Sequence, residues 1–483
     1  MELLIEWRQH FDISFLNPIP NLNLKCDRGM HKIKRITILL SLLFVTCKLN
    51  PTDEVVLIDV ENENDGPSHT VTIVDGYMDS ISYHVGQTAQ VYVNATQKVE
   101  NGIIKLLSVN GIEVDSVKTA AKPQVMSDDE PWAEGYGYDL TFEYDIPRLP
   151  SGIYEWEGKI TFIVKSNEDE VDALVVYPSN TLNAYTTSGG KSLYKPEKDS
   201  AVLVSFQRPM NASDDYHRPF FDWLERQSQY RVGYLCDMDL DDYNELARSR
   251  ILVIAGHSEY WTRKARENFD RFVDSGNDAI VLSGNTMWWQ VRYNSERNQL
   301  ICYKEKYEDP ISDTELKTVR WSDHQLNYSI VSSIGADFDH GGYGNKEDKG
   351  WDGYRIVAEE SPLLEGLALR QGDLLILPTN EYDGAPVSSF DEAGFPVLAQ
   401  DSRGFYRTEL IGFDLTVNRR ERDGVGTFIV FQKAETSGIV INAASMNWCG
   451  EAGIAGQDGD KIQRITLNMF DKLLSHSELF GGN

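Results

Sequence analysis

Between residues 70 and 176, apolar and polar positions alternate over short segments separated by turn residues. A period of two is typical of β-strands that bury one face, and no long helical period interrupts it. Strands are expected at residues 70–74, 88–93, 102–107, 138–144 and 158–164. Short strands with frequent turns predict a β-sandwich domain over residues 67–176.

After this region, the pattern changes to apolar runs that alternate with helix-like segments. The runs lie at 201–206, 230–235, 250–255 and 278–283, and the helix-like segments at 220–229, 242–249 and 262–275. Such alternation predicts a parallel, doubly wound sheet. Residues 300–440 mix loops with further strands, and a strand at 437–442 precedes a closing helix at 462–475. We therefore expect an all-β domain followed by an α/β domain over residues 177–483.

The N-terminal segment has the pattern of an export signal. A basic stretch from Met30 to Arg35 precedes an apolar run over residues 36–46, which ends at Cys47. This run is too short to span a membrane as a stable helix. We expect translation to begin at Met30, a signal peptide up to Cys47, and a polar tether over residues 48–66. The protein is then exported, either secreted or held at a membrane only by lipid on Cys47.

The charge of the chain narrows the range of partners. Lys and Arg number 46 and Asp and Glu number 75, so the net charge is −29. Nucleic acids and anionic lipid surfaces select basic proteins, so neither is an expected partner. Beyond the leader, Cys236, Cys302 and Cys449 are too scattered for a disulfide framework, although one disulfide among them stays open.

Polar residues follow two successive apolar runs of the α/β region. Gly256, His257, Ser258 and Glu259 come after the run at 250–255, and Gly284 and Asn285 come after the run at 278–283. The carboxyl ends of neighbouring parallel strands meet at one edge, where ligands bind. A carboxylate and an imidazole there can bind a cation or move a proton. Alternatively, Ser258 or Glu259 caps the following helix, and spacing alone does not decide between the two.

Two further polar segments indicate a functional site less clearly. The polar segment from Thr181 to Tyr194 lies at the expected domain junction, and Asn380-Glu381 follows another apolar strand. Taken alone, the first segment is interpreted as a linker whose side chains pack at the junction, and the second as a solvent-exposed turn. A GxSxG elbow is absent and no cysteine ends a strand of this region, which disfavours serine and cysteine nucleophiles.

Several of these motifs together resemble one known family, the large (β) subunit of N,N-dimethylformamidase and its homologues. The resemblance covers about residues 150–475. It rests on four motifs: Gly-His-x-Glu-Tyr-Trp at 256–261, Ser-Gly-Asn at 283–285, Asn-Ala-Tyr at 183–185 with Gly-Gly-Lys-Ser-Leu-Tyr at 189–194, and Asn-Trp-Cys at 447–449.

The resemblance implies a mononuclear ferric iron site on a glutamine-amidotransferase-like domain, with two tyrosines and one glutamate as ligands. Glu259 matches the glutamate and Tyr185 matches one tyrosine. Tyr154 is the expected second tyrosine, with Tyr144 and Tyr177 as alternatives. The matching catalytic residues are His257 and Asn285, which would polarise the substrate, and Glu381, which would activate water.

The expected function is hydrolysis of an amide or related C–N bond in a small molecule by an exported, iron-dependent enzyme. A homo-oligomer is left open. The alternative is a surface lipoprotein that binds a glycan or peptide and retains a non-catalytic site. Glycoside hydrolysis by paired carboxylates is a weaker third possibility, because the sequence defines no separation for such a pair.

Overall fold

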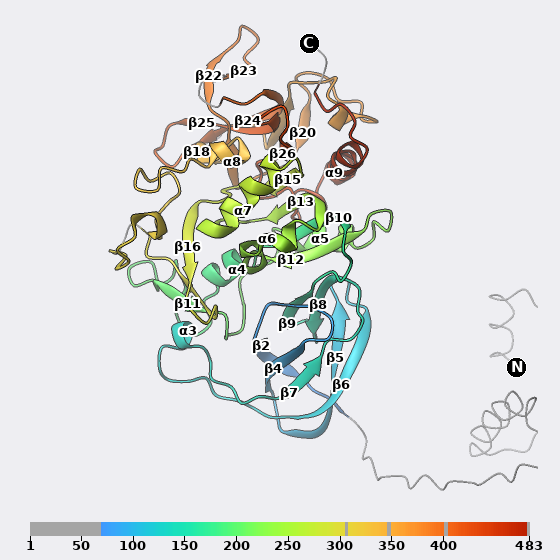
Figure 1. Cartoon of the computed structure of the whole chain (residues 1–483), viewed down its shortest axis with the longest axis vertical. Coiled ribbons are helices and arrows are strands. Elements are labelled where there is room, and N and C mark those ends of the chain that lie inside the picture. Colours follow the sequence, from blue (N-terminus) through green and yellow to red (C-terminus); the bar gives the residue numbers. More distant parts are fainter. Residues whose placement is uncertain (1–68, 305–307, 345–348, 400–403, 481–483) are drawn as a thin grey trace, which may run out of the picture. The chain divides into compact units, whose positions relative to one another are not determined.

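The computed structural model describes residues 69–304, 308–344, 349–399 and 404–480. These residues form several sheets with few helices (Figure 1). Within the described ranges, no helix is both long and apolar enough to span a membrane. The expected start at Met30, the signal peptide, Cys47 and the tether lie outside the described residues.

A β-sandwich occupies the first part of the described chain. One sheet contains β1 (His69–Thr70), β3 (Ser82–Tyr83), β5 (Val99–Ser108), β6 (Glu113–Ala121), β8 (Gly152–Trp156) and β9 (Ile160–Val164). The other contains β2 (Ile73–Met78), β4 (Thr88–Ala95) and β7 (Phe142–Asp145). Alternate residues of β4 are buried, including Val91 and Val93, and they pack in one core with Trp156 of β8. The all-β part of the predicted fold is therefore confirmed.

A large mixed sheet follows, and its first half is parallel. In order across the sheet, the parallel strands are β12 (Val232–Cys236), β10 (Val171–Tyr177), β13 (Ser249–Gly256), β15 (Asp278–Ser283) and β26 (Ile439–Asn442). The sheet continues with antiparallel strands β25 (Asp423–Gln432), β24 (Arg407–Val417), β18 (Asp337–Tyr343) and β21 (Glu381–Gly384). Strands β19 (Gly353–Ile356) and β20 (Leu374–Ile376) join beside β24. The antiparallel half was not predicted.

One predicted strand lies in a different sheet from the one expected. The run at 201–206 forms β11 (Leu203–Ser205), which belongs to a smaller sheet with β14 (Tyr260–Thr262), β16 (Trp289–Tyr293) and β17 (Gln299–Ile301). The first strand of the parallel sheet is instead β10, whose run is almost wholly buried. A run buried on both faces is typical of a parallel strand. The large sheet therefore begins before residue 177. A separate hairpin joins β22 (Val387–Phe390) to β23 (Pro396–Leu398).

The helices are short, apart from two that pack on the large sheet. The α-helices are α3 (Pro131–Glu134), α4 (Ser179–Tyr185), α5 (Arg218–Leu224), α6 (Tyr243–Leu246), α7 (Arg263–Asp274), α8 (Val331–Ile334) and α9 (Gly459–Leu474). Short 3₁₀ turns are η4 (Asp237–Asp241), η5 (Thr314–Leu316) and η6 (Pro362–Leu364). The side chain of Thr262 caps α7 and accepts a hydrogen bond from the Ala265 N–H at 3.0 Å. The helix cap is therefore neither Ser258 nor Glu259, and these residues are available for other roles.

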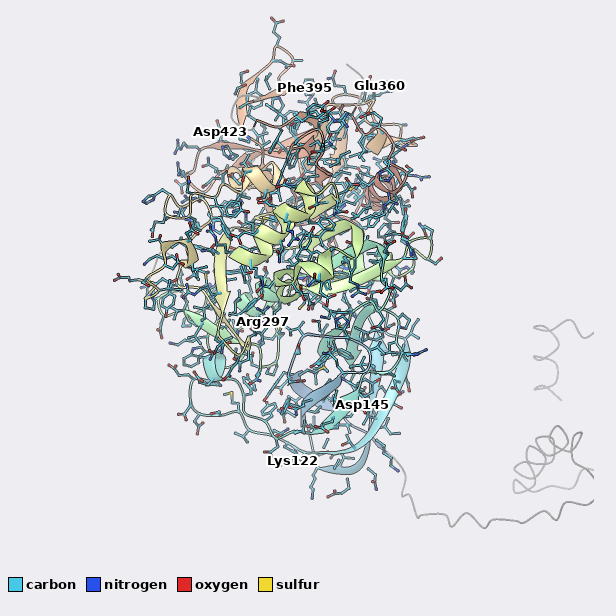
Figure 2. All side chains as sticks on the ribbon, in the orientation of Figure 1. Lys122, Asp145, Arg297, Glu360, Phe395 and Asp423 are labelled. Atoms are coloured by element: carbon cyan, nitrogen blue, oxygen red, sulfur yellow. The ribbon has the colours of Figure 1, made fainter. Side chains whose placement is uncertain are left out.

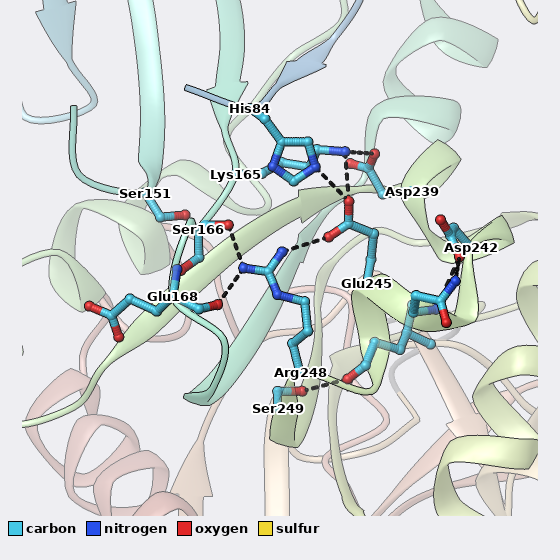
Figure 3. Close-up of polar contacts among 12 residues, drawn as sticks. His84, Ser151, Lys165, Ser166, Glu168, Asp239, Asp242, Glu245, Arg248 and Ser249 are labelled. Atoms are coloured by element: carbon cyan, nitrogen blue, oxygen red, sulfur yellow. Dashed lines mark hydrogen bonds and ion pairs between the residues drawn. The ribbon is translucent and has the colours of Figure 1, made fainter. Parts of the chain in front are cut away.

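A half-buried ionic network joins the sandwich to the elements around β12 and α6 (Figure 3). Lys165, which follows β9, contacts Asp239 at 3.1 Å and Glu245 at 3.0 Å. Glu245 also contacts His84 at 2.8 Å and Arg248 at 3.0 Å. Burial lowers the pKa of Lys165, but the two carboxylates outweigh it and hold that pKa above its ordinary value. These paired charges help to fix the sandwich against the large sheet.

Many charged side chains lie on the surface of the described chain, whereas its cysteines are buried. Charged side chains such as Lys122, Asp145 and Asp423 are exposed at the periphery (Figure 2). Within the described residues, the cysteines at 236, 302 and 449 are all buried and unpaired, so they form no disulfide.

Candidate active site

The order of the parallel strands creates a crevice between β10 and β13. The chain runs from β10 to β12 on one side and then returns to β13 on the other side of β10. Loops that leave the carboxyl ends of two such strands diverge and leave room for a ligand. The loop after β10 leads to Tyr185, and the loop after β13 carries His257 and Glu259.

Glu259 is the centre of a cluster of three oxygen-bearing side chains. Its side chain is buried, and its backbone N–H donates to Thr181 Oγ at 2.9 Å. Tyr185 Oη donates to Glu259 Oε2 at 2.9 Å, and Tyr194 Oη donates to Glu259 Oε1 at 2.6 Å. Two phenols and one carboxylate therefore converge within hydrogen-bonding distance.

The two tyrosines are held in place by the segment that joins them. Their rings stack with centroids 4.4 Å apart. The buried Arg208 guanidinium donates to carbonyl oxygens of this segment, those of Asn183, Ser188 and Lys191, at distances of 2.7 to 2.9 Å. Several bonds from one planar group leave the segment little freedom, so both phenols have fixed positions.

Tyr154, the expected second tyrosine, does not lie at this cluster. It is buried in the sandwich core on β8, and its hydroxyl donates to the Pro150 carbonyl at 2.9 Å. Pairing of β8 with β9 places it opposite Phe162, so the strand register directs the ring into the sandwich. Of the two phenols, that of Tyr194 and not that of Tyr154 converges with Tyr185 on Glu259.

The two alternatives to Tyr154 lie elsewhere as well. Tyr144 is in the sandwich and donates to Asp115 at 2.6 Å. Tyr177 ends β10 and packs edge-on against His217. The useful signal for Tyr194 was its place in the same Gly-rich segment as Tyr185, because Gly189 and Gly190 both have positive φ and let that segment reverse.

The three predicted catalytic residues lie together beside Glu259. His257 Nε2 lies 3.4 Å from Glu381 Oε2 and 3.6 Å from Glu259 Oε2. Asn285 Nδ2 donates to Glu381 Oε2 at 3.0 Å. His257 Nε2 and Asn285 Oδ1 are buried and have no hydrogen-bond partner in the structure. Buried polar atoms usually have partners, so these two atoms are available to a ligand.

Two glycines make this arrangement sterically possible. A Cβ on Gly284 would lie 2.3 Å from the Glu381 carbonyl oxygen, so only glycine lets β21 approach so closely. Gly256 has a φ of +74°, and a Cβ there would lie 2.6 Å from His217 Cβ. The glycines of both sequence motifs therefore bring the loops together.

Burial and neighbouring charges together shift the pKa values of the side chains in this cluster. Burial raises the pKa of Glu259, and nearby His257 and Lys304 partly offset this. Burial and the Glu259 carboxylate together hold the pKa values of Tyr185 and Tyr194 well above the ordinary value. For His257, burial lowers the pKa, but Glu381 and Glu259 outweigh it and the pKa is raised. The ammonium of Lys304 lies 3.3 Å from the Tyr194 ring centroid.

The donor set at Glu259 fits a hard cation. Across the described ranges, no group of three or more His, Cys, Asp or Glu side chains is placed to hold a metal ion. Phenolate and carboxylate are hard oxygen donors, which suit a small, highly charged ion such as ferric iron. Three protein donors would also leave coordination positions open.

A cavity of about 440 Å³ lies beside these groups. His257, Glu381, Tyr185 and Asn380 line it, together with residues that the sequence did not indicate: Pro178, Ala212, Ser213, Tyr216, His217, Tyr343 and Met446. These residues come from segments far apart in the chain. No local pattern marks them, because only the fold brings them to one wall.

The chain is similar to known proteins over most of its length. A ThuA-like protein from Bacteroides uniformis is 11% identical, covers 65% of this chain and 95% of its own, and has a TM-score of 0.33. The N-terminal domain of mmIFT52 is 10% identical, with 54% and 90% covered and a TM-score of 0.27. No curated protein matches the chain. The family model described as N,N-dimethylformamidase beta subunit-like, C-terminal, matches residues 94–460, about three quarters of the sequence. The chain therefore belongs to the N,N-dimethylformamidase beta subunit-like family.

Proposed function

We propose that the chain hydrolyses the C–N bond of an amide and uses a ferric ion held by Tyr185, Tyr194 and Glu259. The observation that carries this proposal is the convergence of both phenol oxygens on one buried carboxylate. Membership of the N,N-dimethylformamidase beta subunit-like family supports an amide as the substrate. The proposed catalytic residues lie beside the three donors, which supports a single site for both parts of the chemistry.

The bound ion would polarise the amide carbonyl and acidify a water molecule. Glu381 is placed to accept the proton of the attacking water and to pass it to the amine nitrogen as the C–N bond breaks. Asn285 donates to Glu381 through Nδ2, which orients this carboxylate, and its Oδ1 stays available to the substrate. His257, which lines the cavity, is placed to donate from Nε2 to the substrate oxygen as negative charge develops there.

Three further features belong to this proposal. The large sheet is of the glutamine-amidotransferase-like type. The protein is exported through the signal before Cys47 and reaches a membrane only by lipid on that residue. Its partner is a small-molecule amide, with self-association into a homo-oligomer as an option.

Two glutamate variants test the proposed roles. Full-length protein purified after iron-replete expression is assayed for iron content and for amine release from formamide and N,N-dimethylformamide. We expect Glu259→Gln to lose both iron and turnover. Glu381→Gln is expected to keep iron but lose about 10²–10⁴-fold in kcat, the usual loss for a general base. Glu143→Gln, at an exposed position of the sandwich, serves as the matched control.

Two results would contradict the proposal. One is wild-type protein that contains no iron under these conditions. The other is Glu381→Gln protein that turns over as fast as wild type. Specific binding to a glycan array without any amide turnover would favour the surface-binding alternative instead.

A further inference from the structure

We infer that the substrate is a neutral carboxamide with a bulky apolar or aromatic substituent, larger than the amide of the family's name. The inference rests on the proposed function, because it takes the cavity beside His257 and Glu381 as the substrate site. It is carried by three properties of that cavity, namely its volume, the chemistry of its walls and the sign of its charges.

The cavity is too large for a formamide-sized molecule alone. Its volume of about 440 Å³ lies within the roughly 300–1,000 Å³ that is usual for drug-sized ligands. A formamide displaces only a few water molecules, at about 30 Å³ each. Most of the cavity would then stay filled with water, and its walls would contribute nothing to recognition.

The walls away from the catalytic residues are mainly apolar or aromatic. Pro178 and Leu182 from the start of α4 form one part, and Ala212, Tyr216 and Met446 form another. Leu182 is buried, and Ala212 and Tyr216 are half-buried. Such surfaces gain free energy when an apolar group replaces water, and aromatic walls suit an aromatic ring.

Three polar side chains of the lining, those of His257, Glu381 and Tyr185, lie close together. His257 and Glu381 lie within 3.4 Å of each other, and Tyr185 adjoins them. Ser213 and Asn380 are exposed, so the cavity reaches solvent on their side. An amide group beside His257 and Glu381 would leave the rest of the cavity, including the wall formed by Leu182, for its substituent.

The charges of the cavity disfavour an anionic substrate. Among the described residues, its lining contains the carboxylate of Glu381 and no lysine or arginine. The other histidine of the lining, His217, is buried, and burial lowers its pKa to about 4, so it is neutral at pH 7. Apart from His257 and the proposed ion, which serve the amide group, the described lining offers no cation to a carboxylate on the substituent.

Four amides test the inference with the iron-loaded, full-length protein. The probes are formamide, formanilide, N-methylbenzamide and the formanilide that carries a para carboxylate. We expect kcat/KM for formanilide or N-methylbenzamide to exceed that for formamide at least about tenfold, since each well-placed apolar group contributes about 10- to 200-fold. The carboxylated formanilide is expected at least about tenfold below formanilide. Fastest turnover of formamide, or equal turnover of the carboxylated probe, would overturn the inference.

A variant that fills the cavity tests whether the aromatic group of the substrate binds at the wall that contains Ala212. Ala212→Trp is expected to lower kcat/KM for the aromatic amides about tenfold and to reduce their advantage over formamide. Val125→Trp adds the same ring at a position that is 87% exposed and serves as the control. An unchanged ratio in Ala212→Trp would place the aromatic group elsewhere and overturn the inference.

Calorimetry separates this inference from the proposed function. N-methylbenzamide is titrated into metal-free, full-length wild-type and Ala212→Trp protein. Turnover of formamide alone would leave the proposed function standing and refute the substrate class. If no amide is hydrolysed, the proposed function fails, whereas binding that Ala212→Trp abolishes would still support the class. If N-methylbenzamide does not bind and the aromatic amides are not hydrolysed, the inferred substrate class is refuted.

Discussion

Replacing Tyr194 with Phe removes one of the two phenol oxygens that contact Glu259. The ring is kept, so its stacking on Tyr185 can persist. Tyr154→Phe is a matched control, because it removes a buried phenol oxygen from the sandwich core. The pair of variants asks which tyrosine supplies the second oxygen donor for iron.

The two changes should differ far more in iron affinity than in stability. Tyr154→Phe loses one hydrogen bond to a carbonyl, about 1 kcal/mol of unfolding free energy. Tyr194→Phe loses a bond to a carboxylate, about 1.5–3 kcal/mol. Residues that merely support a metal ligand change metal affinity about 10- to 100-fold. Loss of a direct donor should therefore cost at least about 100-fold, or about 2.8 kcal/mol at 1.4 kcal/mol per tenfold.

The assay is iron content after dialysis together with the visible absorption band that phenolate-to-iron charge transfer produces. We expect Tyr154→Phe to match wild type in both, and Tyr194→Phe to lose iron and change the band. Urea unfolding of each metal-free variant shows whether the fold persists. If Tyr194→Phe kept iron and band while Tyr154→Phe lost them, the assignment of the donors would be refuted.

Three further predictions concern supporting residues. Gly284→Ala should displace Glu381, because the added Cβ would lie 2.3 Å from the Glu381 carbonyl oxygen. We expect amine release to fall at least about tenfold without loss of iron. Unchanged amine release would contradict this prediction. Arg208→Met should leave buried carbonyl oxygens without a hydrogen-bond donor. We expect the free energy of unfolding in urea to fall by at least about 2 kcal/mol and the variant to retain less iron. Unchanged unfolding free energy and iron content would show that Arg208 holds neither tyrosine. Burial raises the pKa of Asp278 to about 6, so its protonated form favours folding, and this contribution is lost as pH rises from about 4 through 6. Relative to wild type, Asp278→Asn should therefore gain up to about 3 kcal/mol between pH 4 and 7 in urea unfolding, and a constant difference would refute the assignment.

Local patterns were enough to predict much of the fold. Alternation at 88–93 corresponds to β4, and the apolar run at 250–255 corresponds to β13. The helix expected at 262–275 is α7. These elements follow from side-chain periodicity, which each segment carries by itself. The mixed sheet did not follow, because the pairing of β25 with β24 and β26 joins segments whose own sequences do not specify a partner.

The same division holds for the site. The sequence by itself determined that His257 and Glu259 follow a buried strand, and that Asn285 follows the next one. Only the tertiary structure decided that Tyr194, and not Tyr154, contacts Glu259. Both residues carry the same phenol, so chemistry alone cannot separate them. The register of β8 on β9 buries Tyr154 in the sandwich, whereas Arg208 and the Gly-rich turn hold Tyr194 against the carboxylate. Distance is a property of the folded chain, and it selects among residues that the sequence leaves equivalent.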